Sequence, residues 1–336
     1  MFVSSRKAPL MSVLITCYSR KEFILRAIES VLNQTIDRST YEIIVSKNYK
    51  DVYIDDFLIK NHCKIIFDER SGIGVRLAGL IRAAESDILV FLEDDDCFKG
   101  NKLEEIFNIF KDPEVNYVNN AYLTVDYNGN HLSTDHNPAL GNAWGVSTPV
   151  SNFRIMRKLF KKKLYFSMSN ISVRRFMVSE YIDDLSKIRV APDFFMFVTA
   201  LQNKGIVMYC PTTLTVWRLH SSTSVASGPR DEFLKKRKDF WSSVRSDLEL
   251  LSLVSESSTS KKLIYCVYSE AMTHNMVLGE SQFNRIDVII RVAKSFALLR
   301  NAHFFNLLIL ALVGSISPVK TSFIYSKYLL SKAPKI

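Results

Sequence analysis

The stretch LVFLEDDDCF, residues 89–98, places four acidic residues, Glu93 to Asp96 (the acidic cluster), directly after an apolar run. Burying unpaired charge is costly, so a buried strand is expected to end where the acids begin. Neighbouring carboxylates also repel one another, and a bound cation would offset that repulsion. Mg²⁺ and Mn²⁺ prefer oxygen ligands, often one or two carboxylates with substrate phosphates. The stretch by itself predicts either a divalent-metal site or a solvated acidic turn.

Short apolar segments around this stretch alternate with segments of helical periodicity. Four of the apolar segments are expected to be strands: 11–16, 41–48, 63–67 and 87–94. Residues 21–35 and 74–86 carry apolar residues at helical spacing and are expected to be helices. The alternation indicates βαβ units and an α/β fold with a mostly parallel sheet. Because such sheets bind ligands beyond the strand C-termini, we expect Thr16, Asn48 and the acidic cluster to share one crevice.

The second half of the chain has a different pattern. Residues 112–152 are richer in Asn, Gly, Pro and Thr, which predicts mixed strands and loops. A basic helix with one apolar face is expected at 152–166. A further helix is expected at 190–205, because Pro favours the first helical turn and Gly the end. Residues 206–211 and 214–220 are expected to form two short strands.

A Ser-, Gly- and Pro-containing stretch at 221–229 predicts a domain boundary. We therefore expect an α/β domain at residues 1–225 and a helical extension at 226–336.

The end of this extension is unusual in charge. No acidic residue follows Asp287, whereas seven basic residues do, and residues 304–319 are nearly all apolar. A membrane-spanning helix needs about 20 apolar residues, so this run is too short. Basic amphipathic segments bind anionic headgroups, and we expect residues 288–336 to attach peripherally to an anionic membrane surface. Packing of the tail against the first domain and a transmembrane hairpin are the alternatives.

Composition limits the function classes. The chain has 336 residues with 47% hydrophobic and 23% charged residues, which is typical of a globular protein. The net charge of +10 favours an anionic partner such as a nucleotide or acidic lipid. Five widely spaced cysteines without a CxxC pair indicate a reducing compartment. Residues 1–10 lack a signal-peptide core, so a cytoplasmic location is expected, at the inner membrane face if the tail binds lipid.

Four segments occur in an order that resembles the family 2 glycosyltransferases of bacteria and archaea, which have the glycosyltransferase-A fold. The opening segment, 12–35, contains the Thr–x–Tyr–x–Arg and Ser–Val–Leu–x–Gln patterns. FLEDDDCFKGNKL (91–103) matches the aspartate-rich metal motif, known as the Asp–x–Asp motif. APDFFMFVTAL (191–201) matches a later acidic position, and LTVWRLHSSTS (214–224) the Arg–x–His ending. The resemblance covers roughly residues 10–225 and implies a Rossmann-like mixed sheet with helices on both faces.

The resemblance also implies roles for individual residues. Asp95 would be the principal ligand of Mg²⁺ or Mn²⁺, with Asp96 and His220 as further metal residues. Asp193 would be the catalytic base. Six residues would bind the nucleotide-sugar donor: Thr16, Tyr18, Asn48, Arg76, Asp94 and Arg218.

Two positions depart from the family pattern. The family usually has Asp–Asp where this chain has Lys47–Asn48, and its metal motif usually starts with Asp where this chain has Glu93. An aspartate accepts a hydrogen bond from a uracil-type N–H, whereas asparagine can donate or accept, so the base of the donor is left undetermined. We expect Lys47 to be a solvated strand end.

Three of the implied site residues also have simpler interpretations. Asp193 could be a helix N-terminal acid favoured by the helix dipole. His220 could be an ordinary surface histidine, and Tyr18 a packing residue.

The predicted function is metal-dependent, inverting transfer of a sugar from a nucleoside-diphosphate donor to a hydroxyl group of a glycan, polysaccharide or lipid-linked saccharide. An inactive nucleotide-sugar-binding module is the first alternative, because of the Lys47–Asn48 departure. A nucleic-acid-binding protein is a weaker one, since the charge allows it but no helix-turn-helix, zinc or RNP pattern occurs. We therefore expect no nucleic-acid partner.

Overall fold

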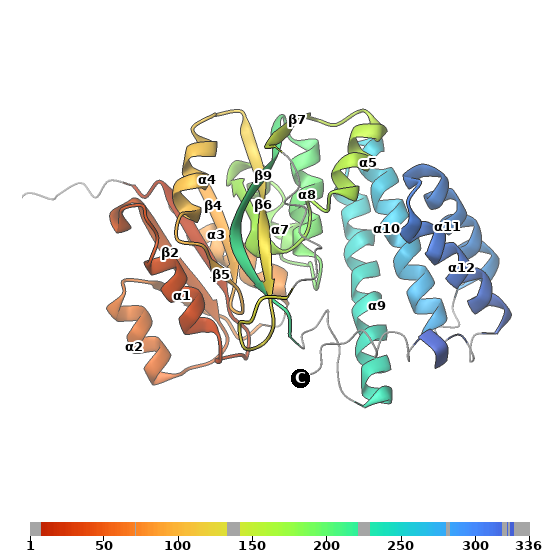
Figure 1. The fold of residues 1–336 in the computed structure, drawn as a ribbon, viewed down its shortest axis with the longest axis horizontal. Helices are drawn as coiled ribbons and strands as arrows, with labels where there is room; N and C mark the ends of the chain where they lie inside the picture. The colour runs from red at the N-terminus through yellow and green to blue at the C-terminus, as the bar shows by residue number, and fades with distance from the viewer. Residues whose placement is uncertain are drawn as a thin grey trace, which may run out of the picture. The chain divides into compact units, whose positions relative to one another are not determined.

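A mixed β-sheet is the framework of the N-terminal part of the chain (Figure 1). The computed structural model describes residues 8–70, 72–132, 142–220, 229–279, 283–317, 321 and 323–325. Within them the sheet has nine strands: β1 (Met11–Thr16), β2 (Tyr41–Lys47), β3 (Lys64–Phe67), β4 (Ile88–Glu93), β5 (Cys97–Phe98), β6 (Val115–Val125), β7 (Trp144–Thr148), β8 (Ile171–Arg174) and β9 (Gly205–Arg218).

The strand order is β3-β2-β1-β4-β8-β6-β9-β5, and β7 also pairs with β9. The ladders β1–β2, β1–β4, β2–β3 and β6–β9 are parallel. The ladders of β8, β5 and β7 with their neighbours are antiparallel and short. The predicted α/β class with a mixed, mostly parallel sheet is therefore confirmed.

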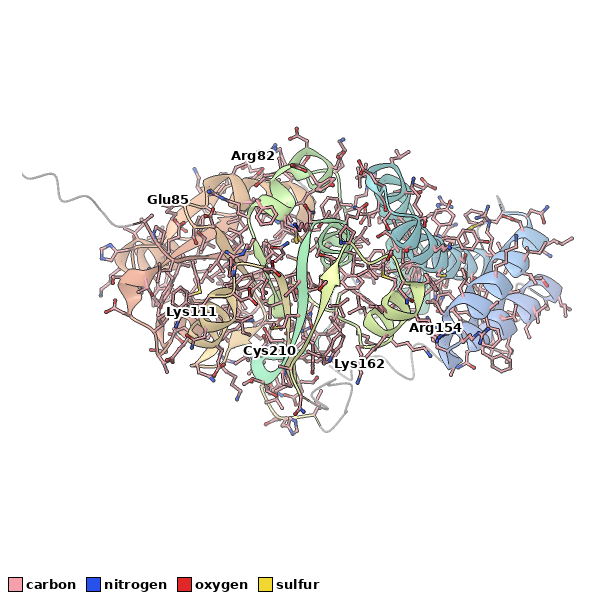
Figure 2. All side chains as sticks on the ribbon, turned by 90° about the horizontal axis from the view of Figure 1, so that it is seen from above. Arg82, Glu85, Lys111, Arg154, Lys162 and Cys210 are labelled. Atoms are coloured by element: carbon pink, nitrogen blue, oxygen red, sulfur yellow. The ribbon has the colours of Figure 1, made fainter. Side chains whose placement is uncertain are left out.

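Helices follow the strands in the alternation expected from the sequence. In this part of the chain they are α1 (Ile24–Leu32), α2 (Val52–Lys60), α3 (Ile73–Ala83), α4 (Lys102–Phe110), α5 (Phe153–Lys161), α6 (Phe176–Ser179), α7 (Ile182–Leu185) and α8 (Pro192–Gln202). The basic helix α5 is shorter than predicted. It buries Met156, Leu159 and Phe160 and exposes Arg154, whose side chain projects from the surface (Figure 2).

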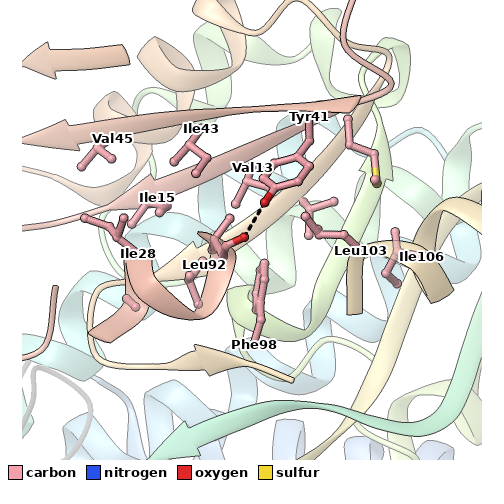
Figure 3. Packing of buried hydrophobic residues seen from close by; sticks show 14 of the residues in the cluster. Val13, Ile15, Ile28, Tyr41, Ile43, Val45, Leu92, Phe98, Leu103 and Ile106 are labelled. Carbon is pink, nitrogen blue, oxygen red and sulfur yellow. Dashed lines mark hydrogen bonds between the residues drawn. The ribbon is translucent and has the colours of Figure 1, made fainter. Parts of the chain in front are cut away.

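One large apolar cluster lies between the sheet and helices α1, α2 and α4 (Figure 3). Successive side chains of a strand alternate between the two faces, so Val13 and Ile15 of β1 point into this cluster together with Ile43 and Val45 of β2. The hydroxyl of Tyr41 donates to the backbone carbonyl of Val31, 2.6 Å away, which ties β2 to α1. Helix α3 contacts β1 and β2 but supplies none of the residues of this cluster, which places it on the opposite face.

The prediction of two short strands at 206–211 and 214–220 is wrong, because β9 is continuous and runs beside β6 (Figure 1). Proline lacks the backbone N–H that a ladder requires, so Pro211 would be expected to interrupt a strand. The register shows how the strand continues: Asn120 pairs with Cys210 and the next residue, Ala121, pairs with Thr213. Residues 211 and 212 therefore form a bulge, so Pro211 has no pairing position in the ladder and the strand continues after it.

The C-terminal part of the described chain is helical, as predicted. Four helices follow one another: α9 (Arg230–Val254), α10 (Ser258–Val277), α11 (Arg285–Leu299) and α12 (Ala302–Ile316). Each packs on the next along the chain. A buried polar group also fixes α10, since Nδ1 of His274 lies 2.6 Å from the hydroxyl of Tyr325. No described helix combines the length and apolar character that a bilayer crossing requires.

The chain divides into two compact units. One comprises residues 1–150, 158–188 and 192–218, and the other 151–157, 189–191 and 219–336. The predicted boundary at 225/226 falls within 221–228, outside the described residues. Within the second unit, the buried carboxylate of Asp247 accepts hydrogen bonds from the backbone N–H groups of residues 189, 190 and 191 at 2.8–3.0 Å.

Candidate functional site

The C-terminal ends of three neighbouring parallel strands bring predicted site residues to one edge of the sheet. Thr16, at the end of β1, lies opposite Ser46 of β2 and Glu93 of β4. Asn48 follows β2 directly, and its Oδ1 accepts a hydrogen bond of 2.8 Å from the backbone N–H of Ser19 in the loop after β1. The structure thus places Thr16, Asn48 and the start of the acidic cluster at the same strand ends.

Lys47 is not the solvated strand end that the sequence suggested. Its side chain is buried and forms an ion pair with Asp55 of α2. Its Nζ also donates to the backbone carbonyl of Tyr49 at 2.6 Å. Helix α2 follows β2 within a few residues and supplies the countercharge, which the local sequence around Lys47 does not reveal. The Lys47–Asn48 departure therefore includes one residue with a structural role.

The acidic cluster forms a tight turn between β4 and β5. The backbone N–H of Asp96 donates to the carbonyl of Glu93 at 3.2 Å, which reverses the chain. Oδ2 of Asp94 accepts from the backbone N–H of Tyr18 at 3.3 Å, and Oδ1 of Asp96 from the backbone N–H of Arg218 at 2.8 Å. The β5–β9 ladder explains the second contact, since it brings the end of β9 beside this turn. The carboxylates are thus held by backbone groups from the loop after β1 and from the end of β9.

Burial and mutual repulsion raise the pKa values of these carboxyl groups. Burial, and then the charges of Asp95 and Asp96, raise the pKa of Glu93 well above its ordinary value. Burial raises the pKa of Asp94 to about 6, although the neighbouring Arg20 acts in the opposite direction. Burial and the charge of Asp95 likewise raise the pKa of Asp96. The cluster therefore carries more negative charge than its surroundings stabilise.

Arg20 is a site residue that the sequence analysis did not single out. Its Nη2 lies 2.5 Å from Oδ1 of Asp94, and its Nη1 lies 2.7 Å from Oδ2 of Asp95. Burial lowers the pKa of Arg20, but the two aspartates outweigh it, so the pKa lies above its ordinary value. The Thr–x–Tyr–x–Arg pattern contains this arginine and was the available signal.

Two further charged residues near the site were also missed. Asp68 directly follows β3, is buried, and binds the guanidinium of Arg70 at 2.6 and 2.8 Å. Its position after the strand CKIIF was a usable signal, by the same reasoning that selected Asn48. Lys102 is fully buried and donates to the carbonyl of Ser169 and the hydroxyl of Thr215. Burial lowers the pKa of Lys102, and nothing in its local sequence predicts this environment.

Arg76 provides buried hydrogen-bond donors at the same edge. Its guanidinium carbon lies 4.3 Å from the ring centre of Tyr18, which is itself partly exposed. Among the described residues, its Nε and Nη1 have no hydrogen-bond partner although both are buried. Burial lowers the pKa of Arg76, while Asp94 and Asp68 act to raise it. Buried N–H groups without partners are costly, so this guanidinium is suited to an anionic ligand.

Asp193 lies in the first turn of α8, as predicted, and is half-buried. Its Oδ1 accepts from the backbone N–H of Phe194 at 2.8 Å. Its charge contributes to the raised pKa of Glu93, so the two carboxyl groups lie near each other. The structure therefore brings Asp193 and the acidic cluster together although 97 residues separate Asp193 from Asp96 in the chain.

The two remaining predicted site residues are Arg218, which binds the acidic turn, and His220, which belongs to the second unit. The guanidinium of Arg218 donates to the backbone carbonyls of Asp95, Asp126 and Tyr127 at 2.8–3.1 Å. It fixes the acidic turn, and its contact with a donor stays a prediction. His220 is buried rather than on the surface and belongs to the second unit, so its metal role also stays a prediction.

The acidic cluster fits a magnesium or manganese ion in its donor chemistry. Oδ2 of Asp96 is buried, and within the described part of the chain no group donates a hydrogen bond to it, although the nearby Ser169 hydroxyl acts to lower the pKa. Over the same residues, no group of three or more His, Cys, Asp or Glu side chains is arranged to hold a metal ion. Mg²⁺ commonly needs only one or two carboxylates when substrate phosphates complete its coordination. Asp95 and Asp96 match that pattern.

Comparison with known proteins agrees with the geometry. The family model Glycosyl transferase family 2 matches residues 12–182, just over half of the chain. The chain belongs to glycosyltransferase family 2. It is 32% identical over 135 residues to the minor teichoic acid biosynthesis protein GgaA of Bacillus subtilis, covering 36% of this chain and 28% of that protein. It is 30% identical over 161 residues to the O-antigen chain rhamnosyltransferase WbaN of Salmonella anatum, covering 48% of each.

This family 2 chain therefore spans at most about half of the length of these relatives. Among solved structures, it resembles Staphylococcus aureus TarS 1–349 in complex with UDP-GlcNAc, with a TM-score of 0.56 and 13% identity. That match covers 94% of this chain and 91% of TarS 1–349. The complex of TarS 1–349 with UDP matches with a TM-score of 0.54 and 11% identity. The shared architecture is the predicted glycosyltransferase-A fold with a C-terminal helical extension.

Proposed function

We propose that this family 2 chain transfers a sugar from a nucleoside-diphosphate donor to a hydroxyl acceptor, with inversion at the anomeric carbon. The observation that carries the proposal is the convergence of three features at one sheet edge. They are a buried, mutually repelling acidic turn, the buried Nε and Nη1 of Arg76, which have no hydrogen-bond partner within the described parts of the chain, and the carboxylate of Asp193. Cation, diphosphate and attacking hydroxyl each have a matching group there.

The acidic turn and Arg76 together suit a diphosphate. Asp95, supported by Asp96, would hold Mg²⁺ or Mn²⁺, which when bound offsets the negative charge of the departing nucleoside diphosphate. The guanidinium of Arg76 supplies donors in a fixed, planar arrangement that matches phosphate oxygens. Thr16, Tyr18 and Asn48 lie on the adjoining strand ends, where the nucleoside would lie. Asp94 would contact the donor ribose.

Asp193 would act as the base toward the acceptor hydroxyl. A positioned carboxylate removes the proton as the oxygen attacks the anomeric carbon. Because the attack comes opposite the leaving diphosphate, the configuration inverts and no covalent intermediate forms on the chain. Asp193 lies in the first turn of α8, where the helix dipole favours a negative charge.

The acceptor class is inferred from relatives. Their names include a minor teichoic acid biosynthesis protein, an O-antigen chain rhamnosyltransferase and a chondroitin synthase. We therefore propose a hydroxyl of a growing surface glycan, polysaccharide or lipid-linked saccharide as the acceptor.

A thermal-shift screen of UDP-, GDP- and dTDP-sugars with Mg²⁺ or Mn²⁺ tests the donor proposal. A ligand that binds only the folded chain raises the melting temperature, and about 100 times its Kd adds about 2.7 kcal/mol of stability. A metal-dependent shift with one donor would then lead to a turnover assay, with the anomer of the first product read by NMR. A donor that binds but is neither hydrolysed nor transferred would instead support the inactive binding module.

The raised pKa values predict how pH affects metal binding. The pKa of Asp94 rises from 3.8 to about 6, so the folded chain holds this proton more tightly than the unfolded chain does. Its ionisation therefore costs stability as pH rises from about 4 through about 6, and a dication removes that cost. Below pH 6 the dication must also displace protons, which weakens its binding about tenfold per proton and pH unit.

In the presence of UDP, the expected result is a larger Mn²⁺-induced rise in melting temperature at pH 7.5 than at pH 5.0, measured with the same UDP and Mn²⁺ concentrations and with metal-free buffer containing UDP as the baseline. Equal shifts at both pH values would contradict metal binding at the acidic cluster.

We also propose that helix α12 binds the surface of an anionic membrane. Its apolar side chains form an exposed stripe at helical spacing: Phe305, Ile309, Leu312, Val313 and Ile316. Residues 301–317 contain no Lys, Arg, Asp or Glu, while the preceding helix α11 and its end carry Arg291, Lys294 and Arg300. The last acid before the stripe is Asp287 of α11, which pairs with Arg291, so Lys294 and Arg300 remain as basic residues without an acid after them. An apolar stripe next to such basic residues suits an interface of acyl chains and anionic headgroups.

Replacing Ile309 and Leu312 by glutamate is expected to lower binding to phosphatidylglycerol vesicles at least tenfold, because each new charge would enter the acyl boundary. Co-sedimentation with vesicles of phosphatidylglycerol and phosphatidylcholine measures the effect. The variant Asn306→Glu is the matched control, since this exposed residue of α12 lies beside the stripe. Equal binding of the stripe variant and wild type would show that α12 is not the membrane contact.

A further inference from the structure

The guanidinium of Arg20 bridges two carboxylates of the acidic cluster. It lies 2.5 Å from Asp94 and 2.7 Å from Asp95, through different nitrogens. The aspartates are almost fully buried, with side-chain exposures of 3% and 13%, whereas the arginine side chain is 35% exposed. One long, partly solvated side chain thus neutralises the two carboxylates that the proposed function assigns to the donor ribose and the metal.

The backbone of Arg20 is held in place by hydrogen bonds, whereas its long side chain can change rotamer. The carbonyl of Arg20 accepts hydrogen bonds from the hydroxyl of Tyr49 at 3.1 Å and from the thiol of Cys17 at 3.2 Å. The preceding residue, Ser19, has φ +59° and is bonded to Asn48 through its backbone N–H. The guanidinium can therefore leave the carboxylates by side-chain rotation, with no change in the loop that presents it.

A guanidinium bound to Asp95 disfavours a dication on the same carboxylate. Two cations a few ångströms apart repel strongly in a partly buried site, and the guanidinium already occupies Oδ2 of Asp95. A diphosphate changes this balance, because its oxygens offer the guanidinium a second anionic partner with matching geometry.

We propose that Arg20 is an internal counter-cation that keeps free divalent metal off the acidic cluster until a nucleoside diphosphate arrives and takes over the guanidinium. This inference rests on the proposed function, because it assumes that Asp95 binds the metal. It makes metal and nucleotide binding mutually dependent: each raises the affinity of the other by the same factor. The chain then keeps its acidic turn neutralised without donor and binds metal only together with it.

Metal binding without nucleotide provides the direct test. The full chain is titrated with Mn²⁺ alone at pH 8, and free Mn²⁺ is followed by electron paramagnetic resonance. We expect Arg20→Gln to bind Mn²⁺ about tenfold more tightly than wild type, because the competing cation is gone. Arg26→Gln is the matched control: Arg26 is an exposed arginine of α1, six residues away, and its loss changes the net charge equally.

Titration in the presence of UDP provides the second measurement. UDP is expected to raise the Mn²⁺ affinity of wild type and Arg26→Gln at least tenfold, and that of Arg20→Gln by less than threefold. Arg20→Lys retains the charge but spans the two carboxylates less well. Its Mn²⁺ affinity without UDP should therefore lie between that of wild type and that of Arg20→Gln. Thermal unfolding of every variant shows whether it is folded at the titration temperature.

The outcomes separate the two proposals. If wild type binds Mn²⁺ with UDP but Arg20→Gln has unchanged or weaker affinity for Mn²⁺ alone, the counter-cation role is wrong and the metal site stands. If no variant binds Mn²⁺ with UDP, GDP or dTDP, the metal-dependent function itself is overturned. If Arg26→Gln gains Mn²⁺ affinity as much as Arg20→Gln does, the effect is one of overall charge and the proposal also fails.

Discussion

Asp95→Asn is expected to lower kcat/KM for sugar transfer by about a thousandfold, because it removes the carboxylate that would hold the cation beside the leaving diphosphate. Asparagine keeps the shape of the side chain and one oxygen but loses the charge. The turn itself should persist, since the backbone carbonyl of Asp95 still accepts from Arg218. The loss is measured as Mn²⁺-dependent turnover of the donor found in the thermal-shift screen.

A non-catalytic readout accompanies this measurement. In the presence of the matching nucleoside diphosphate, Asp95→Asn should also lose Mn²⁺ binding by about a hundredfold. Asp56→Asn is the matched control, because Asp56 is an exposed acid of α2. If Asp95→Asn keeps turnover within about threefold of Asp56→Asn, Asp95 is not the metal ligand and the acidic cluster needs another explanation.

The sheet edge was predictable because its signals are local. Each of the strands β1, β2 and β4 is a contiguous apolar segment that ends at a polar residue, and parallel strands bring such ends together. This reasoning predicts the common position of Thr16, Asn48 and Glu93 from the sequence alone. Applied to the next strand, it would also have found Asp68.

The pairing of charges at this edge could not be predicted in the same way. Arg20 contacts carboxylates 74 and 75 residues later in the chain, and the buried Lys47 pairs with Asp55 of the helix that follows its strand. Spacing in the sequence shows that charges are present but not which of them meet. The continuity of β9 has a similar origin, because the ladder with β6 stabilises a strand that its own proline would be expected to interrupt.

Asp193→Asn is expected to lower kcat by about 10²- to 10⁴-fold, the usual contribution of a general base, and to leave donor binding within about twofold. The helix position explains the second expectation, since the amide oxygen of asparagine can still accept from the backbone N–H of Phe194. Stopped assays with saturating donor and Mn²⁺ give kcat, and calorimetry with the donor gives its Kd.

The matched control is Asp183→Asn, which also removes one negative charge. Asp183 lies on the surface ten residues before Asp193, and its ion pair with Arg82 contributes little to stability. A base acts on the acceptor and not on the donor, so Asp193→Asn should slow transfer much more than the hydrolysis of donor by water when acceptor is absent. If both reactions fall equally with donor affinity, Asp193 instead supports the donor site through its proximity to Glu93, and another group must remove the acceptor proton. If Asp193→Asn and Asp183→Asn have equal turnover, Asp193 is not the base and acts only as a helix N-terminal acid.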